Sequence, residues 1–204
     1  MASRICDSVL VTGSNRGIGL ELVRQLADSP LPPVQIFAGC RDPNGPRSQD
    51  LQELAQKHHD VITVVQLDTT SPTSIAEASK LVEAKLKGKG LNLIINNAGV
   101  NIPGSLVETG KQEMVDVFTT NVVGPMLIAK AALNMLTCCL AEDFRKDGIL
   151  VMSLHPGWVQ TEMGGPEAPL TTLESISSML KVITSLTEKE SGTLLDWEGK
   201  NIPW

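Results

Sequence analysis

Tyrosine is absent from the 204 residues of this chain, so no phenol can serve as an acid anywhere in it. The 17 basic residues are outnumbered by 23 acidic ones, and no block of lysine and arginine forms the footprint that binds a phosphate backbone. No apolar run approaches the roughly 18 residues of a membrane span. The start of the chain lacks the basic-then-apolar pattern of a secretory signal. These absences argue against nucleic-acid and membrane partners and predict a cytoplasmic protein.

Disulfide and metal-binding patterns are missing as well. The four cysteines form neither a Cys-x-x-Cys pair nor the framework of a small secreted domain, which predicts reduced thiols. His58 and His59 have no further ligand at metal-binding spacing, so no metal site is expected. Hydrophobic residues make up 42% of the chain, which is typical of a globular protein. A chain of this length usually folds around one core, so residues 1–204 are predicted to form a single domain.

What the sequence does contain is an alternation of short aliphatic runs with segments whose apolar residues recur at helical spacing. Ser71 followed by Pro72 is typical of an N-cap and the first residue of a helix. Aliphatic strands separated by helices of this length indicate a parallel sheet covered on both faces, and therefore an α/β fold. Strands are predicted at residues 8–12, 34–39, 61–67 and 91–95, with helices between them at residues 18–27, 48–59 and 72–87.

The second half of the chain begins with one long predicted helix at residues 111–146, where apolar residues recur every three to five positions. Pro125 should interrupt it, because a proline has no N–H to donate to the carbonyl of Asn121. A kink there should leave that carbonyl free. A strand at residues 149–154, a helix at 173–186 and a last strand at 192–197 complete the prediction.

Three glycines with the spacing Gly-x-x-x-Gly-x-Gly span the turn between the first strand and the first helix. Glycine lets a backbone approach a pyrophosphate closely, and the N–H groups at the start of the following helix favour an anion. The alternative interpretation is a tight turn that uses small residues for packing. The candidate cofactor-binding residues in this glycine turn are Gly13, Ser14, Asn15, Arg16, Gly17, Ile18 and Gly19.

The residues after the second strand bear on the type of dinucleotide. A carboxylate there would bind a ribose 2′-hydroxyl, whereas a cation would accept a 2′-phosphate. Arg41 holds this position and Arg16 adds a second cation from the glycine turn, so NADP(H) is favoured over NAD. Asp42 keeps NAD open as an alternative, and both arginines could instead be solvated loop residues.

Further motifs follow the later strands. They are Asp68 after the third strand, Asn96-Asn97-Ala98-Gly99 after the fourth, Asn121 in the long helix, and Pro-Gly-Trp-Val-Gln-Thr at residues 156–161. Together with the glycine turn, these motifs resemble the short-chain dehydrogenases/reductases over essentially the whole chain. Within that family the chain is most similar to the sniffer-type and C-factor-like carbonyl reductases, which use NADP(H).

The resemblance implies an NADP(H)-dependent oxidoreductase with a small-molecule carbonyl substrate and a Rossmann-like, doubly wound parallel sheet. It also implies roles for individual residues. Asp68 would contact the adenine. The ribose side would be lined by Asn97, Ala98 and Gly99, and the nicotinamide would be flanked by Pro156, Gly157 and Val159.

The chain departs from the family at the catalytic residues. Members use a tyrosine as general acid, a lysine four residues later, a serine that orients the substrate, and an asparagine whose carbonyl anchors a water. Asn121 and Lys130 match the asparagine and the lysine, and they are the two catalytic candidates. Four residues before Lys130 stands Met126, whose thioether has no proton to give.

The spacing of the two candidates indicates an internal deletion. Asn121 and Lys130 are nine residues apart, whereas several tens of residues separate the matching positions in relatives. On one regular helix they would lie about 180° and ~13 Å apart and could not face one substrate. An exposed helical lysine is the preferred interpretation of Lys130. We therefore expect a shortened isoform, one strand and one helix short of the family fold.

Several consequences are expected. Carbonyl reduction should be weak or absent; the alternatives are a catalytically inactive NADP(H)-binding or interaction protein, and a chain that barely folds. The strand at residues 149–154 should either take the place of the lost strand beside residues 91–95 or leave a gap there. The family's usual homodimer is not carried over, because the two helices that build it are merged here.

Overall fold

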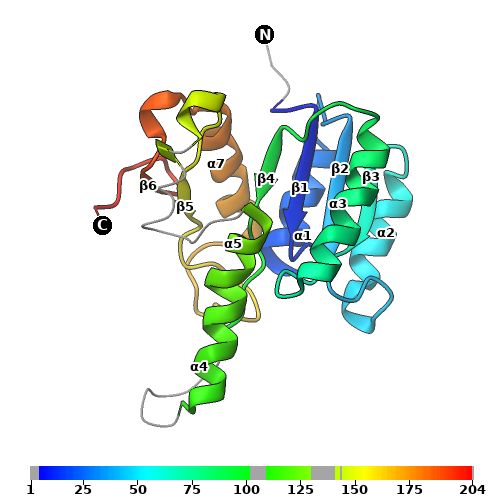
Figure 1. Ribbon diagram of the computed structural model, residues 1–204. Coiled ribbons are helices and arrows are strands. Elements are labelled where there is room, and N and C mark those ends of the chain that lie inside the picture. The colour runs from blue at the N-terminus through cyan, green and yellow to red at the C-terminus, as the bar shows by residue number, and fades with distance from the viewer. Residues whose placement is uncertain (1–4, 102–108, 130–140, 143, 204) are drawn as a thin grey trace. The chain divides into compact units, whose positions relative to one another are not determined.

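The computed structural model describes residues 5–101, 109–129, 141–142 and 144–203 (Figure 1). The chain divides into two compact units, Met1–Ile128 and Ala129–Trp204. The single domain predicted from the length stays a prediction. No helix in the described part of the chain is long and apolar enough to cross a membrane.

A parallel four-stranded sheet forms the centre of the first unit. Its strands are β1 (Ser8–Thr12), β2 (Gln35–Cys40), β3 (Ile62–Gln66) and β4 (Leu93–Ile95), in the order β3-β2-β1-β4. Val11 lies opposite Ala38 on one side and Ile95 on the other. Every residue of β1 is buried, as expected of an aliphatic strand inside a covered sheet. The predicted α/β fold with a parallel sheet is confirmed.

Helices cover both faces of this sheet, with α3 on one face and α1 and α2 on the other (Figure 1). They are α1 (Gly17–Ala27), α2 (Gln49–Lys57) and α3 (Pro72–Leu86), and the 3₁₀ helix η1 (Pro46–Ser48) precedes α2. Ser71 caps α3 as predicted, because its Oγ accepts the N–H of Ser74 at 3.3 Å. The core between α3 and the sheet contains Leu10, Phe37, Val65, Leu67, Ala78, Val82 and Leu86.

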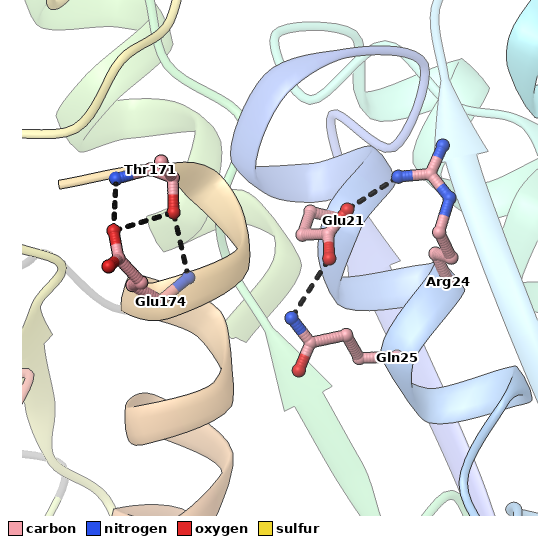
Figure 2. Close-up of polar contacts among 5 residues, drawn as sticks. All are labelled: Glu21, Arg24, Gln25, Thr171 and Glu174. Atoms are coloured by element: carbon pink, nitrogen blue, oxygen red, sulfur yellow. Dashed lines mark hydrogen bonds and ion pairs between the residues drawn. The ribbon is translucent and has the colours of Figure 1, made fainter.

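One carboxylate is buried on α1. Glu21 is 6% exposed, and its side chain is held by the guanidinium of Arg24 and by Nε2 of Gln25, which donates to Oε1 at 2.9 Å (Figure 2). A buried charge is tolerated when its oxygens are paired in this way. The contacts with Arg24 and Gln25 therefore explain why the carboxylate of Glu21 can be buried.

The predicted long helix changes its winding just ahead of Pro125. α4 (Lys111–Phe118) continues through the π-helix η2 (Thr119–Val123) into α5 (Gly124–Ala129). The N–H of Gly124 bonds to the carbonyl of Thr119, five residues back, which is the π pattern. The expected interruption is thus a π segment. Residues 130–140 lie outside the described part, and the predicted end of the helix is instead a 3₁₀ helix, η3 (Arg145–Asp147).

The second unit contains a two-stranded parallel sheet. β5 (Ser153–His155) pairs with β6 (Leu194–Asp196), and α7 (Thr172–Ser185) and the 3₁₀ helix η4 (Glu188–Glu190) come between them in sequence. β5 is shorter than the predicted strand at residues 149–154. Among the described strands β4 pairs with β1, and β5 pairs with β6. The place of this strand relative to residues 91–95 stays a prediction.

A capping box starts α7 (Figure 2). The N–H of Thr171 donates to Oε2 of Glu174 at 3.0 Å, and the N–H of Glu174 donates to Oγ1 of Thr171 at 3.2 Å. The bonds from the backbone N–H and the hydroxyl of Thr171 hold the pKa of Glu174 below its ordinary value. The box determines where α7 begins, and so places Ser175 in its first turn.

Candidate functional site

The glycine turn between β1 and α1 has two positions that favour glycine. Gly13 has a φ of +65° and Gly17 a φ of +55°. A Cβ on Gly13 would also lie 2.8 Å from Cα of Ala98. Arg16, the N-cap of α1, makes no side-chain cap bond, and the first turn of α1 holds no acidic residue. The start of α1 therefore suits an anionic ligand.

Asn97 joins this turn to the loop after β4. Its Nδ2 donates to the carbonyl oxygens of Thr12 at 2.9 Å and of Gly13 at 3.2 Å. Oγ1 of Thr12 in turn accepts the N–H of Asn97 at 3.0 Å and that of Ala98 at 2.9 Å. Thr12 is 1% exposed, so these bonds are made away from water. Two segments distant in sequence thus form one cradle, which we call the Thr12–Asn97 cradle.

Gly19 lies against the same cradle from the first turn of α1. A Cβ on it would lie 2.1 Å from the carbonyl oxygen of Gly13 and 2.5 Å from Nδ2 of Asn97. No side chain fits there unless the backbone of the turn moves. Gly19 thus packs tightly, as the alternative interpretation of the turn predicts, while the approach of a pyrophosphate to this backbone stays a prediction.

The other residues of the glycine turn attach it to its surroundings. Ser14 is buried, and its Oγ donates to the carbonyl of Val11 at 2.6 Å, while its N–H donates to that of Gly39 at 3.0 Å. Asn15 donates from Nδ2 to the carbonyl of Arg47 at 3.2 Å. Ile18 is half-buried. Sequence reasoning missed the Arg47 segment, because a contact across 32 residues leaves no local motif.

The loop after β2 exposes both a cation and a carboxylate. Arg41 is exposed, as is Arg16 in the glycine turn. The carboxylate of Asp42 lies against Gly45, where an added Cβ would be 2.2 Å from Oδ2. Oγ of Ser48 donates to the Asp42 carbonyl at 2.6 Å, which holds this loop in shape. Arg41 could accept a 2′-phosphate, and the exposed Asp42 keeps the NAD alternative open at this loop.

Cys40 ends β2 beside this loop. It is 2% exposed, and burial raises the pKa of its thiol above the ordinary value. Cys6 and Cys40 are both free thiols, whereas Cys138 and Cys139 lie outside the described residues. The protonated thiol of Cys40 is therefore an inert part of the core.

Asp68 follows β3 and is held by its own turn. Its Oδ1 accepts the N–H of Thr70 at 2.9 Å and the Thr70 hydroxyl at 2.7 Å. Its N–H donates to Oγ of Ser74 at 3.0 Å. These bonds fix the carboxylate near the carboxyl end of the sheet, where parallel α/β folds bind their ligands.

Asn121 lies in the π-helix η2 and binds the loop after β4. Its Nδ2 donates to the carbonyl of Val100 at 2.8 Å, and its Oδ1 accepts the Val100 N–H at 2.8 Å. Gly99 packs beside it, because a Cβ there would be 3.4 Å from Oδ1. A role of Asn121 in catalysis would therefore fall to its main chain. Lys130 lies outside the described residues, so its relation to Asn121 stays a prediction.

Pro156, Gly157 and Val159 form a turn in the second unit, directly after β5. Gly157 has a φ of +82°, and a Cβ on it would lie 2.5 Å from Cδ1 of Leu170. Val159 is 4% exposed and forms a β-bridge with Leu170. Sequence reasoning missed Ser175 of α7, which is fully buried and donates from Oγ to the Pro156 carbonyl at 2.7 Å. A serine inside a helix carries no pattern that would signal this contact.

The structure brings the candidates of the first unit together at one end of its sheet. They are the glycine turn, Asn97 with Ala98 and Gly99, and Asn121. In the described part of the chain, no group of histidine, cysteine, aspartate and glutamate could hold a metal ion. The backbone N–H groups at the start of α1 suit a phosphorylated ligand, and its binding there stays a prediction.

Comparison with known proteins agrees with this geometry. The family model for short chain dehydrogenases matches residues 7–132. C-signal of Myxococcus xanthus is 31% identical over 154 residues, which cover 56% of this chain and 93% of C-signal. An uncharacterized oxidoreductase of Schizosaccharomyces pombe is 29% identical in an alignment of 252 residues, which covers 95% of this chain and 96% of that protein.

Two solved structures share the fold. The NADPH-bound carbonyl reductase from chicken fatty liver is 38% identical, with a TM-score of 0.93, over 98% of this chain and 99% of that one. The carbonyl reductase Sniffer of Drosophila melanogaster is 28% identical, with a TM-score of 0.92, over 98% of this chain and 100% of that one. The predicted resemblance to sniffer-type and C-factor-like proteins is confirmed. Because the family model matches more than half of its residues, the chain belongs to the short-chain dehydrogenase/reductase family.

Proposed function

We propose that this chain binds NADP(H), and that it reduces carbonyl compounds weakly or not at all. The observation that carries the binding is the Thr12–Asn97 cradle, whose four hydrogen bonds measure 2.9 to 3.2 Å. Gly13 and Gly19 leave no room for a Cβ at its centre. The uncapped start of α1 offers N–H groups and the positive end of a helix dipole. The residues present therefore fit the pyrophosphate of a dinucleotide.

The phosphorylated form of the cofactor is proposed from the charges beside the cradle. Arg16 and Arg41 are exposed cations that would accept a 2′-phosphate, and these two cations outnumber the exposed carboxylate of Asp42 beside them. The similar chicken carbonyl reductase is described as NADPH bound, which supports this choice. The family resemblance assigns the remaining residues to parts of the cofactor. Asp68 would contact the adenine, Asn97, Ala98 and Gly99 the ribose, and Pro156, Gly157 and Val159 the nicotinamide.

The weak activity is proposed from the missing acid. When bound, a reduced nicotinamide would supply hydride to a carbonyl carbon, and the carbonyl oxygen then needs a proton. The chain has no tyrosine to give it. The side-chain amide of Asn121 is committed to Val100, and Lys130 has no tyrosine whose pKa it could lower. General acid catalysis is worth about 10²–10⁴-fold in rate, so turnover should fall by about that factor relative to a complete enzyme.

A shortened isoform accounts for these losses. The alignment with the Schizosaccharomyces pombe oxidoreductase is 252 residues long, although this chain has 204 residues in all. That alignment therefore contains residues of the relative that have no counterpart here. An internal deletion between Asn121 and Lys130, which are nine residues apart, would account for some of these unmatched residues of the relative. The catalytic serine and tyrosine of the family would lie in the deleted segment.

The second candidate function is a catalytically inactive NADP(H)-binding or interaction protein. The intact Thr12–Asn97 cradle in a chain without tyrosine favours it. Any residual activity would act on a small-molecule carbonyl compound. A cytoplasmic location and the loss of the family's homodimer stay predictions.

Cofactor binding is tested by titrating the purified chain with NADPH and NADH and following cofactor fluorescence. We expect saturable NADPH binding and weaker NADH binding. The melting temperature should rise with NADPH, because a ligand that binds only the native state stabilises it. The absence of saturable NADPH binding would overturn the proposal.

Catalysis is tested by following NADPH oxidation with a panel of aldehydes, ketones and quinones. The matched comparison is a chimera in which the corresponding segment of the chicken carbonyl reductase is inserted between Asn121 and Lys130. We expect little turnover by the natural chain and restored turnover by the chimera. Turnover by the natural chain at the rate of the chicken enzyme would contradict the missing-acid argument.

A further inference from the structure

The peptide group between Pro156 and Gly157 is held from both sides. Its carbonyl oxygen, which belongs to Pro156, accepts a hydrogen bond from Oγ of Ser175 at 2.7 Å. Its N–H, which belongs to Gly157, donates to Nδ1 of His155 at 3.0 Å. Ser175 is fully buried, whereas His155 is exposed at the end of β5. Side chains from two different elements therefore bind both polar groups of one peptide plane.

These two hydrogen bonds to one peptide plane are important because residue 157 is a glycine. A peptide plane turns through ψ of the residue before it and φ of the residue after it, and glycine accepts either sign of φ. The φ of +82° favours glycine at this position, and a Cβ there would also lie 2.5 Å from Cδ1 of Leu170 and 3.1 Å from Cδ1 of Trp197. The same residue removes the steric barrier that would otherwise keep the plane in one orientation. The two hydrogen bonds supply what the side chain of an ordinary residue would supply.

We propose that Ser175 is a positioning residue for the cofactor. Its hydroxyl sets the orientation of the Pro156–Gly157 peptide group, and through it the turn that holds the nicotinamide. This inference rests on the proposed function, which assigns that turn to the nicotinamide. The other partner of the hydroxyl is Sδ of Met179 at 3.7 Å, a weak acceptor, so the Pro156 carbonyl is its main partner.

The test distinguishes binding of the nicotinamide end of the cofactor from binding of its adenosine end. Ser175→Ala is compared with Ser185→Ala, which removes a hydroxyl of the same kind at the far end of α7, where Oγ donates to the Val182 carbonyl at 2.9 Å. Each variant is titrated with NADPH and with adenosine 2′,5′-bisphosphate, which carries the adenosine end and no nicotinamide. We expect S175A to bind NADPH about fivefold more weakly, the effect of one net hydrogen bond. Its bisphosphate affinity should be unchanged, and S185A should match the natural chain with both ligands.

A second variant keeps the test independent of the fold of S175A. His155→Ala removes the other hydrogen bond at an exposed position, where a truncation costs little stability. We expect H155A to weaken NADPH binding by a smaller factor and to leave bisphosphate binding unchanged. The double variant should lose less than the product of the two single losses, because one turned peptide plane accounts for both.

The outcomes distinguish this inference from the proposed function. If the natural chain binds neither ligand, the proposed function fails and this inference fails with it. If the natural chain binds both ligands while S175A binds NADPH as S185A does, only the positioning role is overturned. An equal loss of both ligands in S175A indicates a general structural defect and also overturns it. If S175A does not fold, an unchanged NADPH affinity in H155A overturns it.

Discussion

Asn121 and Val100 exchange two hydrogen bonds of 2.8 Å, one from Nδ2 to the backbone carbonyl and one from the backbone N–H to Oδ1. The pair ties the π-helix η2 to the loop that contains Asn97, Ala98 and Gly99. A residue that the family resemblance assigns to catalysis therefore also holds the loop of the candidate cofactor-binding residues in place. This structural role can be measured whether or not the chain turns over a substrate.

Asn121→Ala should lower the free energy of unfolding by about 2 kcal/mol, because it leaves the N–H and carbonyl of the half-buried Val100 without their partner. Urea unfolding followed by circular dichroism measures the change. The exposed Asn101 gives a matched control, and Asn101→Ala should have almost no effect. Equal midpoints for the two variants would show that the Asn121–Val100 pair contributes nothing to stability.

Thr12→Val should destabilise the first unit by about 2 kcal/mol and weaken NADPH binding. Valine has nearly the same shape as threonine but no oxygen, so the N–H groups of Asn97 and Ala98 lose their acceptor in a buried place. Thr12→Ser keeps the oxygen and serves as the control. Chemical unfolding and cofactor titration measure both effects. A valine variant as stable as the serine variant contradicts the importance of this acceptor.

Gly19→Ala should lower the free energy of unfolding by about 1–3 kcal/mol and abolish saturable NADPH binding. The added Cβ would lie 2.1 Å from the carbonyl oxygen of Gly13, so the glycine turn must move. Gly90→Ala is the control, because nothing lies within 4 Å of a Cβ at that position. If G19A bound NADPH as tightly as G90A, the close approach at Gly19 would have no role in binding.

The first unit could largely be predicted from the sequence, because its signals are local. The aliphatic run of β1 stops at Gly13. Ser71 and Pro72 start α3, where the capping hydrogen bond joins Ser71 to Ser74, only three residues further along the chain. The residues of the glycine turn and Asn97 could be named from motifs for the same reason. Predicted and observed ends of these elements differ by at most two residues, as expected where helices and strands fray.

The remaining features depend on contacts that no local pattern encodes. Ser175 meets Pro156 across 19 residues, and Asn15 meets the Arg47 segment across 32. The π-helix η2 depends on how the backbone accommodates Pro125, for which the sequence indicates only an interruption. The pairing partner of β5 could not be predicted either, because several sheet edges can accept one short aliphatic strand.

Glu174 should titrate below its ordinary value, because the backbone N–H and then the hydroxyl of Thr171 bind its ionised form. Because the pKa of Glu174 is lowered in the folded state, its contribution to stability is complete at pH values above the ordinary pKa of a glutamate. The contribution is lost as the pH falls through the lowered pKa. Thr171→Ala should raise the pKa of Glu174 only part of the way, since the backbone N–H remains. NMR titration measures it, and the pKa of Glu190, lowered in the same way by Thr187, should not change. An unchanged pKa of Glu174 would mean that the hydroxyl has no part in the shift.

Arg41→Ala should weaken NADPH binding about tenfold and leave NADH binding almost unchanged, because the two cofactors differ only in the 2′-phosphate that the guanidinium would accept. The NADPH affinity of the variant should also depend less on salt, since a screened charge pair is lost. Arg145→Ala is the matched control: it removes an exposed arginine of the second unit that pairs with Glu142. If R41A weakened the binding of both cofactors equally, Arg41 would support the shape of the loop and would not bind the 2′-phosphate. If it weakened neither, the preference for NADP(H) would have to come from Arg16 or from the Arg47 segment, which Asn15 holds beside the glycine turn.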